Sequence, residues 1–108
     1  MAKINSKQKG KVGELEFSNL CKEHGFKKVR RSQQYAGINN DADVVGLPGM
    51  HIEVKRVERL NISKAVKQAI RDKADDEIPI VAHRKNREDW LITMTADDWF
   101  KLYKKYIE

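Results

Sequence analysis

The fold is decided by the stretch Asp43-Val-Val-Gly-Leu-Pro-Gly-Met-His-Ile-Glu-Val-Lys55. Across residues 50–55, apolar and polar side chains alternate. This period of two predicts a β-strand that buries one face in a core and presents the other face outward. Residues 47–49 (Leu-Pro-Gly) are a turn signal, so residues 41–45 are predicted to form the partner strand of a hairpin.

Two carboxylates and an amine gather in this hairpin. Pairing of the two strands returns Asp43 to the neighbourhood of Glu53, and alternation places Glu53 beside Lys55 on the outward face. Two hard oxygen ligands completed by waters suit Mg²⁺. An exposed Glu–Lys pair alone more commonly forms a weak surface ion pair. The upstream Asp43 and the basic surroundings favour a metal-dependent phosphodiesterase over that simpler interpretation.

The composition restricts the class of protein and its partners. A chain of 108 residues, 40% hydrophobic and 35% charged, is expected to form one globular domain spanning residues 1–108. Its net charge of +6 points to a polyanion, with nucleic acid ahead of an anionic membrane surface. One cysteine, Cys21, excludes an intramolecular disulfide and a cysteine-rich zinc site. No membrane-spanning run or signal-peptide core is found, so an intracellular, cytoplasmic protein is expected.

The remaining elements follow from periodicity and turn signals. A basic arm (1–9) leads into a helix over about 10–24, which Gly25 ends. A second helix covers about 62–70, with Asn61 or Ser63 as its cap. A third begins at a capping-box-like segment, 95–98. Strands are predicted over 26–31, 41–45, 50–55, 78–83 and 90–95, with a polar loop at 32–40.

The order αβββαββα predicts an α/β (α+β) fold with a mixed sheet flanked by helices. The last helix carries an apolar stripe, which is expected to pack into the core, with a dimer contact as the alternative. This stripe consists of Trp99, Leu102, Tyr103, Tyr106 and Ile107.

These elements and their motifs together resemble the PD-(D/E)XK nuclease superfamily with its restriction-endonuclease-like core. Within it, the chain is most similar to archaeal-type and phage Holliday junction resolvases. The resemblance runs from Gly10 to about Gln68, and Ala42 stands where the signature has proline. It is carried by Gly10-Lys-Val-Gly-Glu-Leu-Glu16, Gly25-Phe26, Arg30-Arg31, Tyr35-Ala36-Gly37, Asp43-Val-Val-Gly46 and Ile52-Glu-Val-Lys55.

The resemblance implies a role for each matching residue. Asp43, Glu53 and the backbone carbonyl of Val54 would hold Mg²⁺ or Mn²⁺. Glu14 would complete the acidic pocket, directly or through water. Lys55 would orient or activate the attacking water and steady charge on the phosphate, and Gln68 would approach from its helix. The products would carry a 5′-phosphate and a 3′-hydroxyl.

Several alternatives stay open at this level. Glu16 could replace Glu14, because the imperfect apolar stripe of the first helix does not say which carboxylate faces the sheet. Asp41 could replace Asp43, because both have the same strand parity. His51 shares the outward face with Glu53 and is expected to be a surface bystander. Gln68 lies off the apolar stripe of its helix, which predicts solvent exposure.

Basic residues flank the proposed site in sequence and are predicted to contact DNA phosphates. They are Lys9, Lys11, Arg30, Arg31, Arg56, Arg59, Lys64 and Lys67. We therefore expect a Mg²⁺-dependent, structure-selective DNA endonuclease, foremost a junction resolvase that works as a homodimer on branched or double-stranded DNA. The alternatives are a nuclease of this fold acting on ends, flaps or single strands, and a catalytically silent nucleic-acid-binding module.

Overall fold

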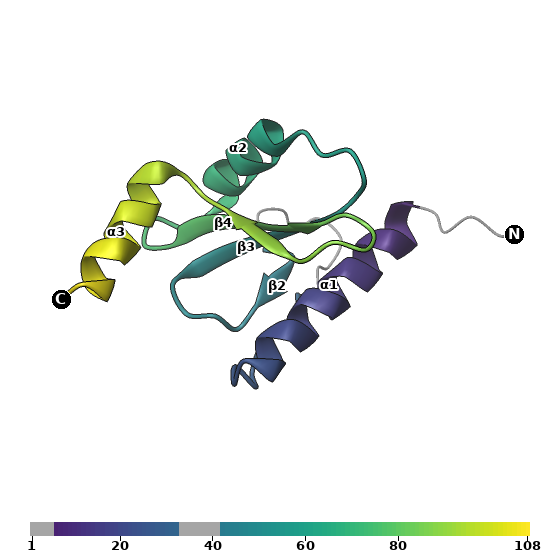
Figure 1. The fold of residues 1–108 in the computed structure, drawn as a ribbon, viewed down its shortest axis with the longest axis horizontal. Coiled ribbons are helices and arrows are strands. Elements are labelled where there is room, and N and C mark those ends of the chain that lie inside the picture. Colours follow the sequence, from purple (N-terminus) through teal and green to yellow (C-terminus); the bar gives the residue numbers. More distant parts are fainter. Residues whose placement is uncertain (1–5, 33–41) are drawn as a thin grey trace, which may run out of the picture.

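A computed structural model describes residues 6–32 and 42–108 (Figure 1). This part of the chain forms an α/β fold in the predicted order αβββαββα. Residues 33–40 of the predicted loop, which include the motif at 35–37, and the alternative ligand Asp41 lie outside the described residues. The helices are α1 (Ser6–Glu23), α2 (Ile62–Asp72) and α3 (Ala96–Tyr106), and the strands are β1 (Arg30–Arg31), β2 (Val44–Val45), β3 (Met50–Arg56), β4 (Ile78–Arg84) and β5 (Leu91–Thr93).

The strands form one mixed sheet in the order β1-β2-β3-β4-β5. Strand β2 pairs antiparallel with β3, with Val44 opposite Ile52, so the predicted hairpin is confirmed. Strands β3 and β4 pair in parallel over their full lengths, and α2 forms the crossover between them. The other two pairings, β1 with β2 and β4 with β5, are antiparallel.

Helices α1 and α2 lie on opposite sides of the β3–β4 pair (Figure 1). On the α1 side, Phe17 packs into a core with Ile52 and Ile80. On the α2 side, Ala65 and Ala69 pack around Val81. Both faces of β3 are therefore covered, as is usual for a strand with a parallel partner.

The expectation that Glu53 faces outward is wrong. Glu53 and His51 are each only 2% exposed, because α2 covers the face on which they lie. The alternation of apolar and polar residues predicted correctly that these two side chains share a face. It gave no information about a helix that arrives later in the chain and covers that face.

The ends of the helices agree largely with the predicted signals. Asn61 is the N-cap of α2 and accepts from the backbone N–H of Lys64, so Ser63 is not the cap. Thr95 caps α3 in the same way, accepting from the N–H of Asp98. Gly25 has a φ of +98°, as expected just after the end of α1.

Several predicted boundaries are wrong. The strand predicted over 90–95 is limited to Leu91–Thr93, because Thr95 already caps α3. Helix α1 begins at Ser6, so the last four residues of the predicted basic arm are helical. The strand predicted over 26–31 shrinks to Arg30–Arg31, because residues 24–28 form turns instead of pairing. In these turns the N–H of Phe26 donates to the carbonyl of Cys21, and the N–H of Val29 donates to that of Phe26.

Helix α1 crosses the sheet at very close range at Gly13. A Cβ atom at this position would lie 2.6 Å from Cβ of Arg56 on β3. Only glycine permits this approach without displacement of the strand or the helix. This close contact fixes the position of the next residue, Glu14, relative to the sheet.

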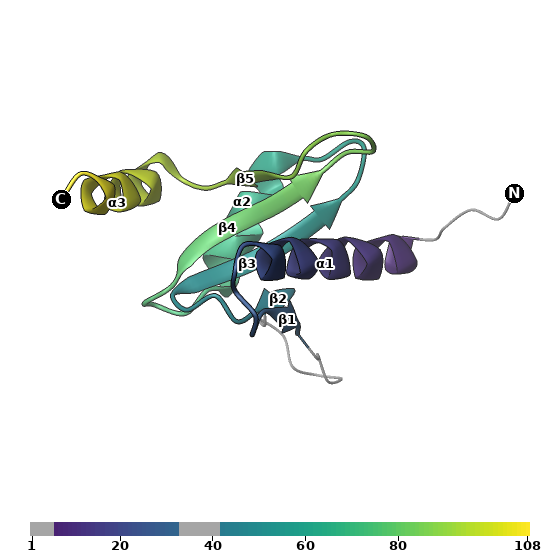
Figure 2. The same ribbon diagram turned by 60° about the horizontal axis from the view of Figure 1, so that its bottom comes forward.

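Helix α3 lies away from the sheet at one end of the molecule (Figures 1 and 2). None of the residues of α3 is buried, so the expectation that its apolar stripe packs into the core is wrong. A stripe at helical spacing shows that one face is apolar, but it does not identify what covers that face. None of the described helices is both long enough and apolar enough to cross a membrane.

Candidate active site

The β2–β3 hairpin brings Asp43 to the middle of β3. Asp43 directly precedes β2, and its Oδ2 atom accepts a hydrogen bond of 2.9 Å from the backbone N–H of Val54. Val54 follows Glu53 on β3, so two carboxylates ten residues apart in sequence meet at one place in the sheet. The predicted approach of Asp43 to Glu53 is confirmed.

Electrostatics show how tightly these carboxylates are grouped. Burial, together with the neighbouring charge of Glu53, raises the pKa of Asp43 from 3.8 to about 7. The Val54 N–H bond opposes this rise, and the charge of Glu14 adds to it. Three acidic side chains therefore act on one another in a partly dry region. A cation bound between them would relieve their repulsion.

The donor set fits a hydrated hard cation. Asp43 and Glu53 offer carboxylate oxygens, and the Val54 carbonyl lies on the same side of β3 as the N–H that contacts Asp43. Among the described residues, no group of three or more His, Cys, Asp or Glu side chains is arranged to hold a metal ion. Two carboxylates and one carbonyl match Mg²⁺, which keeps several of its waters.

The two carboxylates on α1 have different partners. Oε1 of Glu14 accepts from Nε of Arg31 at 3.0 Å, and the charge of Glu14 reaches Asp43. Oε1 of Glu16 pairs instead with Nε of Arg56 at 3.3 Å and with a terminal nitrogen of Arg84 at 3.0 Å. Of the two, Glu14 is therefore the α1 carboxylate whose charge acts on Asp43, and its role at a metal site stays a prediction.

Helix α2 places a polar side chain over Lys55. The Lys55 Nζ donates to Oε1 of Gln68 at 3.2 Å, and both side chains are half-buried. The expectation that Gln68 is solvent-exposed is wrong, because α2 lies over the face of β3 that carries Lys55. The amine is thus held on the same strand face as Glu53, two residues away.

His51 is the site residue that sequence reasoning missed. Its Nε2 lies 2.8 Å from Oε1 of Glu53, and its Nδ1 lies 3.7 Å from Oε1 of Glu77. Burial alone would lower the pKa of His51, but the hydrogen bond to Glu53 and the nearby acidic charges outweigh burial and raise it. The available signal was the spacing of two residues between His51 and Glu53, which places both side chains on one face of β3. Because that face was expected to be exposed, a contact between the two was not predicted.

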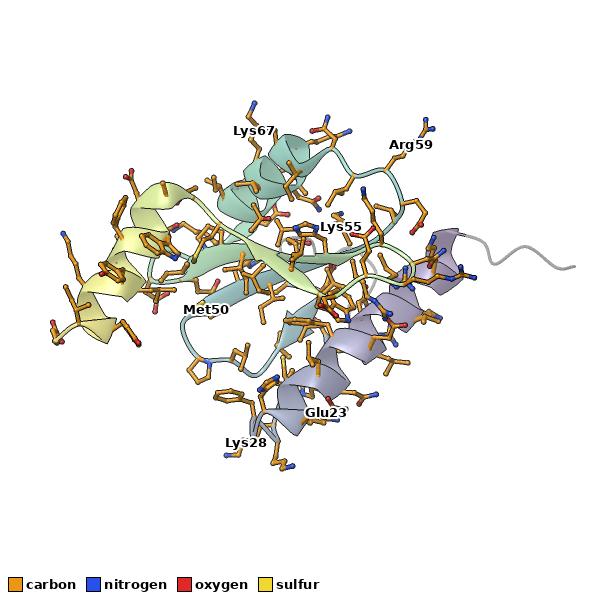
Figure 3. The ribbon with its side chains drawn as sticks, in the orientation of Figure 1. Glu23, Lys28, Met50, Lys55, Arg59 and Lys67 are labelled. Carbon is orange, nitrogen blue, oxygen red and sulfur yellow. The ribbon has the colours of Figure 1, made fainter. Side chains whose placement is uncertain are left out.

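The basic residues divide into two groups. Arg31 and Arg56 are held in ion pairs with Glu14 and Glu16, and only 12% of the Arg56 side chain is exposed. Lys9 is half-buried. Figure 3 shows Lys55 over the middle of the sheet, with Lys67 and Arg59 projecting outward on the α2 side. The exposed cations available to a polyanion are Lys11, Arg30, Arg59, Lys64 and Lys67.

The chain was also compared with known proteins. No protein-family model matches it, and no curated protein matches it in sequence.

Proposed function

We propose that this protein is a metal-dependent DNA endonuclease of the PD-(D/E)XK type that hydrolyses phosphodiester bonds in branched DNA. One observation carries the proposal. Asp43 and Glu53 converge from two strands in a partly dry site, beside an amine, Lys55, that Gln68 holds in place. A core that had no use for this charge would be more stable with apolar residues here.

Each residue has a chemical task in this proposal. Asp43, Glu53 and the Val54 carbonyl would hold Mg²⁺ or Mn²⁺, and Glu14 would contribute directly or through water. The bound ion would polarise the phosphate and lower the pKa of a coordinated water. Lys55 donates hydrogen bonds to the attacking water or to the phosphate oxygens, where negative charge grows in the transition state. Gln68 keeps the Lys55 amine at the required place, and His51 fixes the orientation of the Glu53 carboxylate.

The substrate follows from charge. The chain carries a net charge of +6, and exposed cations flank the acidic site that would otherwise repel a phosphate backbone. Contacts to phosphates position a nucleic acid without reading its sequence, which suits recognition of a branched shape. A four-way junction needs two nicks, and a two-fold homodimer supplies two sites.

The test is cleavage of a labelled four-way DNA junction in Mg²⁺, beside linear duplex, flap and single-stranded substrates. Paired nicks on the junction are expected, and Glu53→Gln should reduce their rate by about 1000-fold. Glu14→Gln and Glu16→Gln form a matched pair on one helix. The first should impair cleavage more, because only Glu14 belongs with Asp43.

Other outcomes would change the proposal in defined ways. Cleavage of flaps, ends or single strands in preference to the junction would keep the chemistry and discard the junction assignment. DNA binding without cleavage in Mg²⁺ and in Mn²⁺ would contradict the proposed activity and favour a silent binding module. Binding is followed in Ca²⁺ by fluorescence anisotropy, so loss of binding and loss of chemistry are separated.

A further inference from the structure

The exposed face of α3 is the largest feature that the proposed chemistry does not use. Trp99, Tyr103 and Tyr106 form one stripe along the helix and are 48%, 43% and 83% exposed. Their rings stack in sequence, with centroids 5.2 Å apart for the first pair and 6.4 Å apart for the second. Leu102 and Ile107 extend the stripe and are also exposed. Among the described residues, this aromatic stripe has no covering element.

The apolar surface continues from α3 onto the body of the molecule. An apolar groove of about 310 Å³ runs beside Leu102 and is lined by side chains of α1, β4 and β5, among them Phe17, Leu20 and Ile92. Leu91 and Ile92 of β5 are themselves about half exposed. The helix and the groove therefore present one continuous apolar face rather than scattered residues, which is the mark of an interaction site.

A helix of this length gains little stability by itself. Eleven residues give a rod of about 16 Å. Isolated helices shorter than about 12–15 residues are marginal in water, and most helical stability in proteins comes from packing of an apolar face. The aromatic stripe is therefore expected to be covered in the functional protein.

The charges of α3 are complementary to a second, antiparallel copy of the same helix. Its first turn is acidic, with Asp97 and Asp98, and its last turn is basic, with Lys104 and Lys105. Asp98 and Lys105 are seven residues apart, or almost two turns, so they lie on the same flank of the stripe. Trp99 and Tyr106 have the same spacing. Reversal of the helix direction thus places acidic residues opposite basic ones and Trp99 opposite Tyr106.

We propose that α3 is the dimer interface, where two copies of the chain pack their α3 helices antiparallel about a two-fold axis near Leu102. Asp98 of each copy, whose carboxylate already accepts from Thr95 and pairs with Lys101 at 3.3 Å, then lies opposite Lys105 of the other as a second cationic partner. The neighbouring grooves extend the apolar contact. This deepens the homodimer of the proposed function, but the interface itself does not depend on nuclease activity.

The available area supports a second copy as the occupant. With aromatic side chains carrying roughly 150–250 Å² each, the exposed face of α3 and β5 offers about 700 Å² per copy. A standard specific interface buries about 800 Å² per partner. A single strand of nucleic acid stacked on the aromatic rings is the main competitor. The acidic first turn and the aliphatic residues beside the rings favour protein over nucleic acid.

The first test is sedimentation equilibrium of the full chain at protein concentrations up to about 100 µM. This range is needed because interfaces of this area have dissociation constants that can be as weak as about micromolar. The wild type should have twice the monomer mass of 12.5 kDa. The double substitution Trp99→Glu, Tyr103→Glu should be monomeric. Leu15→Glu on α1, where Leu15 is 51% exposed, is the matched control and should remain dimeric. Circular dichroism melting checks that every variant is folded.

A charge-reversal experiment tests the orientation without touching the apolar face. Asp98→Lys and Lys105→Glu should each weaken self-association by about tenfold, because each creates two like-charged contacts per dimer. Mixing the two variants should restore association, because both contacts in the mixed dimer are again between opposite charges. A parallel pair would already set Asp98 against Asp98 and Lys105 against Lys105 in the wild type, so neither single variant would weaken its association.

Three results would overturn the proposal. They are a monomeric wild type, a dimeric Trp99→Glu, Tyr103→Glu variant, and reversed charges that fail to recover on mixing. A monomeric wild type whose binding of single-stranded oligonucleotide is lost in the aromatic variant would instead assign α3 to nucleic acid. Junction cleavage is measured separately on the same samples. Loss of the dimer and loss of the chemistry are therefore distinguishable.

Discussion

Strand β3 buries ionisable side chains, whereas helix α3 exposes aromatic ones. On the face of β3 under α2, His51 and Glu53 are almost fully buried although both are ionisable. On α3, Trp99 and Tyr106 are exposed although both are aromatic. Each arrangement is unfavourable for an isolated folded chain. Both exceptions to ordinary burial lie where a ligand or a partner is expected to complete the structure.

Removal of one buried charge tests the β3 side most strongly. Asp43→Asn should reduce DNA cleavage by about 1000-fold, because a ligand of the proposed ion is lost. The same change should stabilise the metal-free protein at pH 8 by about 1–3 kcal/mol, since a neutral amide removes the repulsion with Glu53. Its side-chain oxygen still accepts from the Val54 N–H. Cleavage assays and urea denaturation measure the two effects.

Asp75→Asn is the matched control, because Asp75 lies exposed in the turn before β4. It should change neither cleavage nor stability by a measurable amount. A loss of both activity and stability in Asp43→Asn would show that the carboxylate stabilises the fold, and it would contradict a purely functional reason for its burial.

The pH dependence of stability gives a second, smaller effect. Because the pKa of Asp43 is raised from 3.8 to about 7, the native state holds a proton between these values that the unfolded chain has released. Stability of the metal-free protein should therefore fall as the pH rises through this window. His51 acts in the same direction, because the stability that comes from its raised pKa is lost as the pH rises through that pKa.

The measurement is the urea midpoint in EDTA at pH 5 and at pH 8, for the wild type and for Asp43→Asn. The wild type should lose more stability between the two than the variant does. Added Mg²⁺ should raise the midpoint of the wild type at pH 8, because a ligand that binds the native state stabilises it. Identical pH profiles for the two proteins would remove Asp43 as the source of the effect.

Helix α1 differs from α3 because it packs tightly on the sheet. Gly13→Ala should cost about 1–3 kcal/mol, since the new methyl group would meet Cβ of Arg56 at 2.6 Å. Gly10→Ala on the same helix meets nothing within 4 Å and should stabilise by up to about 1 kcal/mol. The measurement is the melting temperature of each variant. Shifts of the same sign for Gly13→Ala and Gly10→Ala would contradict close packing at Gly13.

Much of the fold was predictable because it depends on local signals. The turn at residues 47–49 and the alternation after it give the β2–β3 hairpin, and the Asn61 cap gives the start of α2. The convergence of Asp43 and Glu53 follows from the hairpin alone. The strand predicted over 26–31 exists only as Arg30–Arg31, because strand length depends on a partner, and β2 itself has only two residues.

The errors about the site have one physical cause. Periodicity identifies which side chains share a face, but the element that covers the face is set by the crossover of the chain. The parallel β3–α2–β4 unit lays α2 over Glu53 and Lys55, which buries His51 and brings Gln68 to the lysine. For the same reason the exposure of α3 was not predicted, because its apolar stripe has the same spacing as that of a helix packed in a core.

The hydrogen bond between Asp43 and the backbone of β3 means that the Val54 amide proton can report the state of the site. The Val54 N–H is tied to a carboxylate instead of a neighbouring strand, so its exchange with deuterium depends on whether that side chain stays in place. Its nuclear magnetic resonance frequency should follow the charge on Asp43 during titration with acid or with Mg²⁺. A single backbone signal can thus report occupancy of the site in solution without any DNA present.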